Sequence, residues 1–587
     1  MADSIRIAST GGTWGDDPSR LRRRLEVGPV DYLAPAFLGP LTPPLLQRQR
    51  SRDPRLGYAR EFVAQVEEAL PLLRAGAARI VTDAGGVNPP ACRGALLETV
   101  RLHGAALEVA AVLGDDLLPR LGELNATGVT LDHAVTGAPF AAIREQVSSA
   151  HADLGARPAA QALCDGARIV VTGWSGGGGA VLAAMIHAFD WAEDDWDRLA
   201  AGAIAAHLAA GDDDRDFEVA ADGSFVVGAD PGGGVSLDAI RERLIERMGD
   251  PRAHAVADVT ADLASVRLER AGPGRVRVWG VRGRAPAGPL EVEVRHFAGW
   301  WASGALVLAA PGAAGRARAL AARFWERLGH CCQATRTEVV GASACWGDLA
   351  PPCDPPEVLL RLAARDGDRA KVERFARALA AFARSAPAGV AAVGPESGVE
   401  QVVARWPARV PRERAPATLV TRDGERTLTP AAAAATPVRP RALAAPRWPT
   451  ARGSRRLVAA PLSALARARS GDRGDALAIG VVARAPEVYP WLEGALTAAV
   501  VKRRFRGICR GRVERRAVPN LHALGFVLND AMDGDAARAL RIDPQGRTLA
   551  AALLAMEMKV PQAMLDAAAR ADAGDGGAPS GGRGGRR

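Results

Sequence analysis

The sequence predicts an α/β fold whose core is a parallel, Rossmann-like sheet in the N-terminal part of the chain. From Ile5 to about His187, short apolar runs alternate with longer stretches in which apolar residues recur at helical spacing. Such alternation is typical of βαβ units around a parallel sheet. A second observation agrees: each short run leads into a loop rich in Gly, Asp or Asn, residues that favour turns and helix starts.

The expected strands of this sheet are residues 5–9, 79–82, 107–113 and 168–172. Helices are expected at residues 58–73 and 91–102, because apolar residues there are spaced three and four positions apart. Residues 218–300 contain short β-rich runs separated by Gly and Pro. We expect that segment to be either a β-rich subdomain or a β-rich extension of the sheet.

The rest of the chain divides by composition. Helices are expected at residues 315–328 and 357–382, which complete a main domain over residues 1–384. Residues 385–455 are rich in Pro, Ala and Arg without a sustained apolar period, which predicts a flexible linker. Globular patterning resumes over residues 456–562 as a second domain. The Gly- and Arg-rich residues 563–587 are expected to be a disordered tail.

The composition is that of a folded protein with more than one domain. The chain has 587 residues, 48% hydrophobic and 24% charged, unlike the charge-rich composition of disordered chains. The formal net charge is +9, but the arginines are scattered among comparable numbers of Asp and Glu. Apart from residues 502–504 and the tail, no basic stripe with interleaved aromatics is present, so we do not expect nucleic-acid binding.

Cysteine usage and the N-terminus indicate a cytoplasmic protein. The seven cysteines show neither a disulfide ladder nor paired zinc spacing, which fits reduced thiols and assigns no metal ligands. Cys331 and Cys332 are interpreted as structural, because only neighbouring His330 is there to activate a thiol. A leader and a membrane-length apolar run are both lacking, so no membrane partner is expected. The sequence leaves the oligomeric state open, a homo-oligomer included.

Four loops of one chemical type follow the four expected strands, at residues 11–18, 83–90, 114–116 and 173–179. The carboxyl ends of parallel strands lie at one edge of a sheet, where open α/β folds bind ligands. The loops are therefore expected to converge on one crevice. The residues expected to line it are Gly12, Asp16, Asp83, Asn88, Asp115 and Gly173.

The catalytic candidates are the polar residues of these loops, Asp16, Asp83, Asn88 and Asp115. Each aspartate has two interpretations. In the first, the aspartate caps the start of a helix, and this interpretation is favoured for each residue taken alone. In the second, the carboxylates meet and hold a divalent cation or bind substrate hydroxyls, and the convergence of the loops favours this interpretation for the set. Asn88 is either an Asx-turn residue or an amide presented to a ligand.

The last of the four loops and two histidines carry further alternatives. The four consecutive glycines at 176–179 precede an expected helix, so their N–H groups could cradle a phosphate or carboxylate, or the run could be a loosened turn. His187 has apolar neighbours and is interpreted as a core residue. His133 lies in a loop and is the better candidate for a base, although no motif supports it.

Taken in order, these loops and several further motifs resemble the acyclic terpene utilisation (AtuA) family. The matching segments are GTWGD at 12–16, QRQRSRDPRLGY at 47–58, AGGVNP at 84–89, GDDL at 114–117, VTG at 171–173, IHAFDW at 186–191 and DDWD at 194–197. Residues 465–484, 489–492 and 517–532 resemble the small C-terminal domain of this family. The resemblance implies that the second domain is α+β with a ferredoxin-like fold.

The resemblance also implies a function in the catabolism of acyclic terpenes such as citronellol and geraniol. It implies a branched 3-hydroxy-acyl-CoA thioester as ligand, with lyase- or hydratase-type chemistry. The residues that we assign to ligand binding are Gly12, Trp14, Gly15, Gly85, Gly86, Gly173, Ser175 and Gly176 in the first domain, and Arg473, Asp475, Asn520 and His522 in the second.

Two points leave alternatives open. In the second domain, Arg473 could hold an anion beside a polar cluster of Asp472, Asp475 and His522, or the Gly-rich turn could only set hairpin geometry. In the first domain, the family pattern T-G-R-V-A-D-S-A-L is T-G-W-S-G-G-G-G-A at 172–180, without the arginine and the aspartate. This loss favours the alternative that the protein is a non-catalytic accessory or scaffold.

Overall fold

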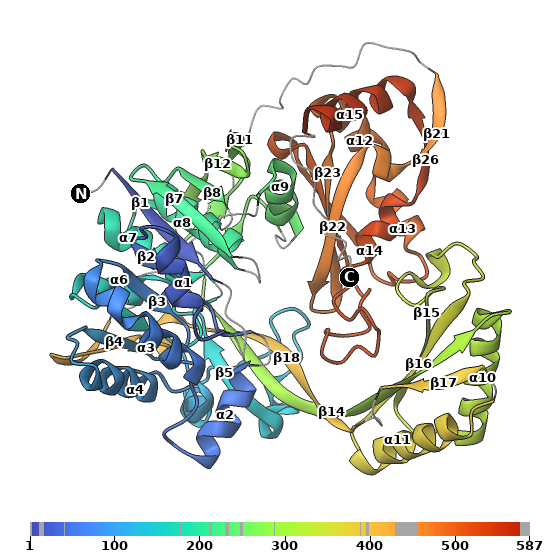
Figure 1. The fold of residues 1–587 in the computed structure, drawn as a ribbon, viewed down its shortest axis with the longest axis horizontal. Coiled ribbons are helices and arrows are strands. Elements are labelled where there is room, and N and C mark those ends of the chain that lie inside the picture. The colour runs from blue at the N-terminus through green and yellow to red at the C-terminus, as the bar shows by residue number, and fades with distance from the viewer. Residues whose placement is uncertain are drawn as a thin grey trace, which may run out of the picture. The chain divides into compact units, whose positions relative to one another are not determined.

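The fold is described from a computed structural model. It describes residues 3–10, 17–39, 42–176, 178–210, 214–228, 234–246, 250–286, 288–387, 389–394, 398–428 and 456–575. The chain divides into two units (Figure 1). The first comprises Met1–Ile240, Asp250–Gly299 and Gln401–Ala442, and the second comprises Arg241–Gly249, Trp300–Glu400 and Leu443–Arg587.

The centre of the first unit is a run of parallel strands in the order β1-β2-β3-β6-β4. Their bounds are β1 Ser4–Ser9, β2 Tyr32–Leu33, β3 Arg79–Thr82, β4 Val109–Leu113 and β6 Ile169–Val171. Antiparallel strands extend this run on both sides: β7 Arg215–Ala220, β8 Phe225–Gly228, β12 Arg275–Trp279 and β11 Arg267–Gly272 beyond β1, and β19 Thr418–Thr421 and β20 Gly424–Thr427 beyond β4. The mixed α/β class is confirmed, and the Rossmann-like description stays a prediction.

Helices bury both faces of the parallel strands, which is why these strands are continuously apolar. Phe62 and Leu70 of α3 and Leu96 of α4 pack with Ile80 and Ile169 in one buried cluster. Alternate residues such as Val81 and Val170 point to the opposite face and are also buried. The helices of this unit are α1 Arg20–Val27, α2 Thr42–Arg52, α3 Arg60–Ala75, α4 Pro89–Leu102, α5 Leu121–Ala126, α6 Arg157–Cys164, α7 Gly179–Phe189, α8 Trp196–Ala209 and the start of α9 Leu237–Glu246.

Two further sheets follow. A short one contains β9 His254–Ala255, β10 Thr260–Asp262 and β13 Arg282–Arg284. The other is built on the long strand β14, Leu290–Ala309. In the first unit, β14 pairs with β5 Val147–Ala152 and β18 Glu400–Val410. In the second unit, β15 Ala334–Val340, β16 Glu357–Asp366 and β17 Val390–Val393 complete the sheet with it, and α10 Ala313–Leu328 and α11 Arg369–Arg384 supply the helical part of that core.

One expected helix is half strand. Residues 357–382 were expected to be helical, but Glu357–Asp366 is β16 and only Arg369–Arg384 is α11. Val358, Leu360 and Leu362 alternate into the core. A Leu- and Ala-rich run fits either period, and pairing with β14 and β15 selects the strand.

The structure also differs from the linker expected over residues 385–455. Residues up to 428 include β17, β18, β19 and β20. In β18 every second residue from Val402 to Val410 is buried, with Trp406 at the centre. Ala404, Ala408 and Pro407 hide this alternation in the sequence, because neither residue type signals a strand. Residues 429–455 lie outside the described residues.

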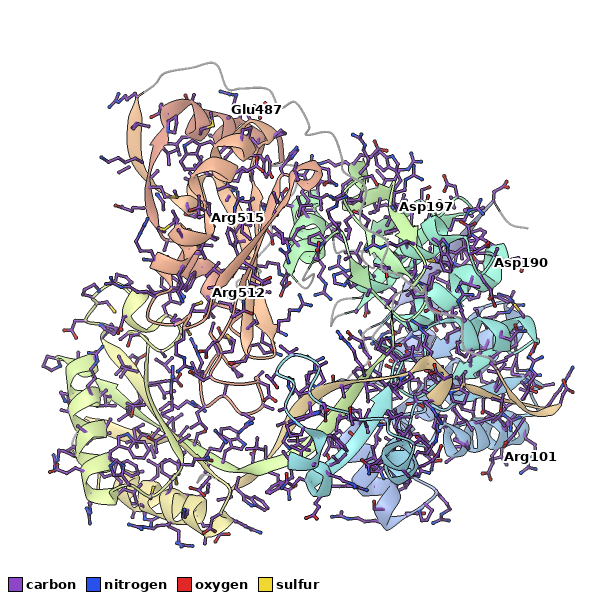
Figure 2. The ribbon with its side chains drawn as sticks, turned by 180° about the vertical axis from the view of Figure 1, so that it is seen from behind. Arg101, Asp190, Asp197, Glu487, Arg512 and Arg515 are labelled. Carbon is purple, nitrogen blue, oxygen red and sulfur yellow. The ribbon has the colours of Figure 1, made fainter. Side chains whose placement is uncertain are left out.

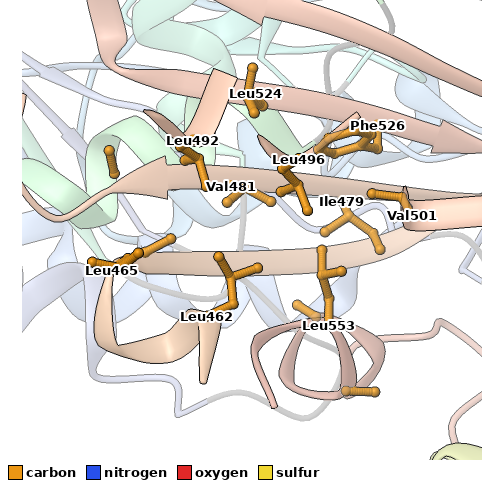
Figure 3. Close-up of a cluster of buried hydrophobic side chains, with 14 of the residues drawn as sticks. Leu462, Leu465, Ile479, Val481, Leu492, Leu496, Val501, Leu524, Phe526 and Leu553 are labelled. Atoms are coloured by element: carbon orange, nitrogen blue, oxygen red, sulfur yellow. The ribbon is translucent and has the colours of Figure 1, made fainter. Parts of the chain in front are cut away.

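The C-terminal part of the second unit has an antiparallel sheet in the order β22-β23-β25-β24. The strands are β22 Ala466–Arg473, β23 Ala476–Ala483, β24 Val513–Val518 and β25 Ala523–Leu528, and a separate pair joins β21 Leu457–Pro461 to β26 Glu557–Pro561. The helices are α12 Tyr489–Ala495, α13 Ala498–Arg504, α14 Leu549–Leu554 and α15 Gln562–Asp575. Figure 3 shows Ile479, Val481 and Phe526 of the sheet meeting Leu492 and Leu553 of the helices in one core.

The disordered tail was predicted to begin at residue 563, which is too early. Residues 563–575 belong to α15, where Met564, Ala567 and Ala568 pack into the core of this domain. The apolar residues of α15 are mostly alanines, so the sequence shows little amphipathic contrast there. Residues 576–587 lie outside the described residues. Among the helices that the structure describes, none is long and apolar enough to cross a membrane.

The basic run Lys502-Arg503-Arg504 has contacts inside its own domain. Lys502 Nζ donates to the carbonyl oxygens of Cys509 and Gly511, and Arg504 donates to that of Ala552 at 2.8 Å. Arg515, labelled in Figure 2, likewise donates to the carbonyl oxygen of Leu496 at 3.1 Å. These cations satisfy carbonyl groups at chain turns and helix ends.

Trp406→Ala tests whether β18 is a structural strand. The indole of Trp406 is buried and donates to the carbonyl oxygen of Leu131 at 2.9 Å. Truncation should lower the unfolding free energy of the first unit by about 3–5 kcal/mol, because it leaves a cavity. Urea unfolding followed by circular dichroism measures this, with exposed Glu425→Ala as control. Equal stability of the two variants would show that residues 400–410 behave as a linker.

Candidate functional site

The loops after β3, β4 and β6 lie together at the carboxyl ends of these strands. The backbone N–H of Trp174, after β6, donates to Oδ2 of Asp115, after β4, at 2.9 Å. A Cβ placed on Gly85, after β3, would lie 2.6 Å from the carbonyl oxygen of Thr172. Three of the four expected loops therefore contact one another. In the fourth, Gly12, Trp14, Gly15 and Asp16 lie outside the described residues.

A buried Asp115–His151 pair is the centre of this region. Oδ2 of Asp115 lies 2.9 Å from Nδ1 of His151, and both side chains are almost inaccessible to solvent. The backbone reinforces the pair, because Ala152 N–H donates to the carbonyl oxygen of Asp115 and Leu117 N–H donates to that of Ala150. The strand β5, which carries His151, is thus joined to the loop after β4.

The protonation of His151 is set by opposing effects. Burial lowers its pKa, but the hydrogen bond to Asp115 and the negative charges of Asp115, Asp116 and Glu293 raise it more, so the pKa of His151 lies above its ordinary value. Nε2 of His151 is buried and has no hydrogen-bond partner within the described part of the chain. An imidazole held by a carboxylate, with its second nitrogen unsatisfied, is suited to acid–base chemistry.

Sequence reasoning did not identify His151. It named His133 and His187 instead, and these have other surroundings. The ring of His133 packs edge-on against Trp406, and Nδ1 of His187 lies 2.6 Å from the hydroxyl of Tyr32. Within SSAHAD, the alternation of a strand would have placed His151 on a buried face, but nothing in the sequence indicated that Asp115 faces it.

Asp83 and Asn88 connect their loop to neighbouring segments. The carboxylate of Asp83 accepts the N–H groups of Phe37 at 2.6 Å and Leu38 at 3.3 Å. Burial raises the pKa of Asp83 to about 6, against the partial opposition of these N–H groups. Nδ2 of Asn88 donates to the carbonyl oxygens of Pro54 and Leu56. Both side chains join their loop to neighbouring segments by hydrogen bonds, and ligand binding by Asp83 and Asn88 stays a prediction.

The glycines of these loops are required by close packing. A Cβ on Gly173 would lie 2.2 Å from Oδ2 of Asp115, and one on Gly86 would lie 2.4 Å from Leu46. Gly86 and Gly176 also have positive φ angles of 61° and 62°, which side chains rarely adopt. A Cβ on Gly176 would meet Asp153 at 2.2 Å. Ser175 lies between these positions, half-buried at the start of the turn before α7.

A second group of buried charges follows β5. Burial raises the pKa of Asp153 to about 6 and also raises that of Asp258, while the positive charge of Arg412 opposes both shifts. Asp153 accepts Gly155 N–H at 3.0 Å, and Asp258 accepts Ala156 N–H at 2.8 Å. Sequence reasoning also missed this group, because its members are far apart in the chain.

The neighbouring acidic residues accept N–H groups two positions further along the chain, as in Asx turns, just before helices. Asp17 accepts the N–H of Ser19 at 2.9 Å, just before α1. Asp116 accepts the N–H of Leu118 at 3.1 Å and lies 3.3 Å from Arg50. Within the described ranges, no group of three or more His, Cys, Asp or Glu residues is arranged to hold a metal ion.

The polar cluster expected in the second domain is not formed. Arg473 and Asp475 flank the β22–β23 turn, whereas Asn520 and His522 precede β25, whose Ala523 pairs with Val482 at the far end of β23. The two ends of β23 are about 20 Å apart. Asp475 accepts the N–H of Gly534 at 2.7 Å, and burial lowers the pKa of His522 to about 4. Of the two interpretations of this motif, a polar cluster or a turn that sets hairpin geometry, the antiparallel register excludes a cluster of Asp475 with His522, because it holds the two residues at opposite ends of β23.

Gly173→Ala should disturb the Asp115–His151 pair. The added Cβ has no room beside the carboxylate, so Asp115 must move, and we expect a loss of about 1–3 kcal/mol in stability. Gly94→Ala is a matched control, because Gly94 lies in α4 with open space around it. That change should leave stability unchanged or raise it by about 0.5–1 kcal/mol. Thermal unfolding of both variants measures the contrast, and similar midpoints would contradict the packing argument.

Asp83→Asn should alter the pH dependence of stability. Because the pKa of Asp83 is about 6 when folded and near 3.8 when unfolded, the folded state binds the proton more tightly. Stability should therefore fall as pH rises from about 4 to about 6, by on the order of 3 kcal/mol, and this part should vanish in the variant. Urea midpoints at several pH values measure it, with exposed Glu145→Gln as control. Parallel profiles for the native chain and Asp83→Asn would refute the assignment.

Comparisons with known proteins place the chain in a family. The family model described as acyclic terpene utilisation family protein AtuA matches residues 5–210 and 217–421, and the model of the AtuA ferredoxin-like domain matches residues 460–559. The searches of curated proteins and of solved structures gave no significant match. Because the first model covers more than half of the 587 residues, the chain belongs to the acyclic terpene utilisation (AtuA) family and carries its ferredoxin-like domain at the C-terminal end.

Proposed function

We propose that this protein binds a branched acyl-CoA thioester of acyclic terpene catabolism at the loops after β3, β4 and β6, and acts on it by lyase- or hydratase-type chemistry. The observation that carries the proposal is the buried Asp115–His151 pair, whose Nε2 atom has no partner among the described residues. Family membership supports the terpene context. The resemblance to family members supports the thioester as the ligand class.

In this proposal His151 is the acid–base group and Asp115 positions it. In dehydration, a proton leaves the carbon next to the carbonyl group, a carbon–carbon double bond forms, and the 3-hydroxyl group departs with that proton as water. In lyase cleavage, a proton leaves the 3-hydroxyl group, the bond between carbons 2 and 3 breaks to give a carbonyl compound and an enolate, and the proton returns to carbon 2. Nε2 of His151 would accept that proton, and Asp115 would stabilise the resulting imidazolium. The raised pKa of His151 agrees with a carboxylate that favours the charged imidazole.

The second candidate is a non-catalytic accessory or scaffold protein that binds the same class of metabolite. Trp174 stands where the family pattern that this loop resembles has an arginine, so the cation that would neutralise a carboxylate or an enolate is replaced by an indole at this position. The loop carboxylates Asp83 and Asp115 are also occupied by backbone N–H groups. This candidate predicts ligand binding without turnover.

His151→Gln and Asp115→Asn test the proposal. Calorimetric titration with a branched 3-hydroxy-acyl-CoA measures binding, and a discontinuous assay for released acetate, acetyl-CoA or the dehydrated thioester measures turnover. We expect His151→Gln to lower kcat by about 10²–10⁴-fold while KM changes little, because a general base acts mainly in the transition state. Asp115→Asn should lower kcat and shift the pH profile.

His103→Gln is the matched control, because His103 is half-exposed at the end of α4. It should keep native binding and turnover. Turnover unchanged by His151→Gln would remove His151 from the mechanism. Binding without turnover by the native chain would favour the accessory protein, and failure of every thioester to bind would overturn the ligand assignment.

A further inference from the structure

Two adjacent cysteines lie at a surface cavity of the second unit, whereas the loops described above belong to the first unit. The cavity has a volume of about 550 Å³ and lies between residues 330–333 and 366–371. Cys331 and Cys332 follow the end of α10 and precede β15, so they lie in the connection between a helix and a strand. The cavity also has His330, Asp366 and Lys371 in its wall.

The surroundings hold this connection in place. The N–H of Gln333, directly after the cysteines, donates to Asp366 at 2.8 Å, and Lys371 forms an ion pair with the same carboxylate at 3.6 Å. On the other side, Arg374 of α11 donates to the carbonyl oxygen of Leu328 at the end of α10. The two cysteines are therefore fixed between anchored residues.

The two sulfur atoms lie 3.3 Å apart. Both cysteines are free thiols, Cys331 buried and Cys332 half-buried at the cavity. With metal–sulfur bonds of about 2.3 Å, this separation corresponds to an angle of about 90° at an atom bonded to both sulfurs. That angle is typical of a pyramidal three-coordinate centre, and it is far from the angle of a linear two-coordinate ion.

The surroundings of Cys331 and Cys332 disfavour deprotonation of both thiols, but they do not disfavour binding of one Lewis acid by both sulfur atoms. Burial raises the pKa of Cys332 to about 12, and the adjacent Cys331 adds to the shift, while Lys371 opposes it. A neutral thiol pair is a poor nucleophile for alkylation or oxidation. A Lewis acid bound to both sulfurs removes their mutual repulsion, and soft sulfur ligands prefer soft centres.

We propose that Cys331 and Cys332 form a dithiol site that chelates a thiophilic, pyramidal Lewis acid of the trivalent arsenical type, with the third substituent in the adjacent cavity. With phenylarsine oxide, the arsenic–oxygen double bond and two S–H bonds break and two arsenic–sulfur bonds form. The two protons leave with the oxygen as water, and no atom changes its oxidation state. This site needs only two protein ligands.

The test uses the full reduced chain and equimolar phenylarsine oxide. Intact mass spectrometry should show one adduct with the mass of the reagent less one water. The adduct should resist excess glutathione and be removed by the dithiol dimercaptopropanol. Peptide mapping of the native chain should locate it on the fragment that contains residues 331 and 332.

Cys331→Ser and Cys332→Ser should each weaken binding by about 100-fold, because the second bond of a chelate is intramolecular. The double variant Cys345→Ser/Cys353→Ser is the control and should bind like the native chain. An adduct on other cysteines, no adduct on the native chain, or undiminished binding by either single variant would overturn the proposal. Mapping of the native chain decides the matter if a serine variant does not fold.

Discussion

The carboxylate of Asp115 is the constraint on which the candidate site depends. Asp115 follows β4, and its carboxylate joins two segments that are distant in the chain. It accepts the N–H of Trp174, after β6, and it is hydrogen-bonded to the imidazole of His151 on β5. A buried carboxylate is costly unless its oxygens are paired, so these contacts come as a set. The same set explains why residue 173 is a glycine: the carboxylate occupies the space of a side chain.

Three further acids of the first unit are buried, and each accepts hydrogen bonds from backbone N–H groups. Asp83 is paired with the segment at Phe37, and Asp153 and Asp258 with the turn before α6. Burial raises the pKa of all three. Buried acids with raised pKa values are typical of functional sites as well as of structural networks, so the acid–base proposal rests on the Asp115–His151 pair and not on them. The hydrogen bonds of these acids would also suit a rigid, non-catalytic scaffold. A measurement of turnover distinguishes an enzyme from such an accessory protein.

The ferredoxin-like domain is stabilised by its apolar core, and its polar motifs serve its turns. The Asp475 carboxylate accepts the N–H of Gly534 beside the β22–β23 hairpin, and His522 adopts a positive φ of 53° where the chain enters β25. The residue types at Asp475 and His522, which match a family pattern, are therefore explained by the backbone geometry at these positions. Their ligand-binding role stays a prediction.

The sequence by itself determined the α/β class, the strands β1, β3, β4 and β6 to within a few residues, the helices α3, α4 and α10, and the family, because these depend on local period and on contiguous motifs. Only the tertiary structure decided that residues 357–366 and 400–410 are strands. The Leu- and Ala-rich run 357–366 fits either period until a partner strand pairs with it, and Pro407 obscures the strand pattern of 400–410. The tertiary structure alone brought His151 to Asp115 and separated Asp475 from His522. Such pairings depend on register between segments distant in the chain, which no local pattern records.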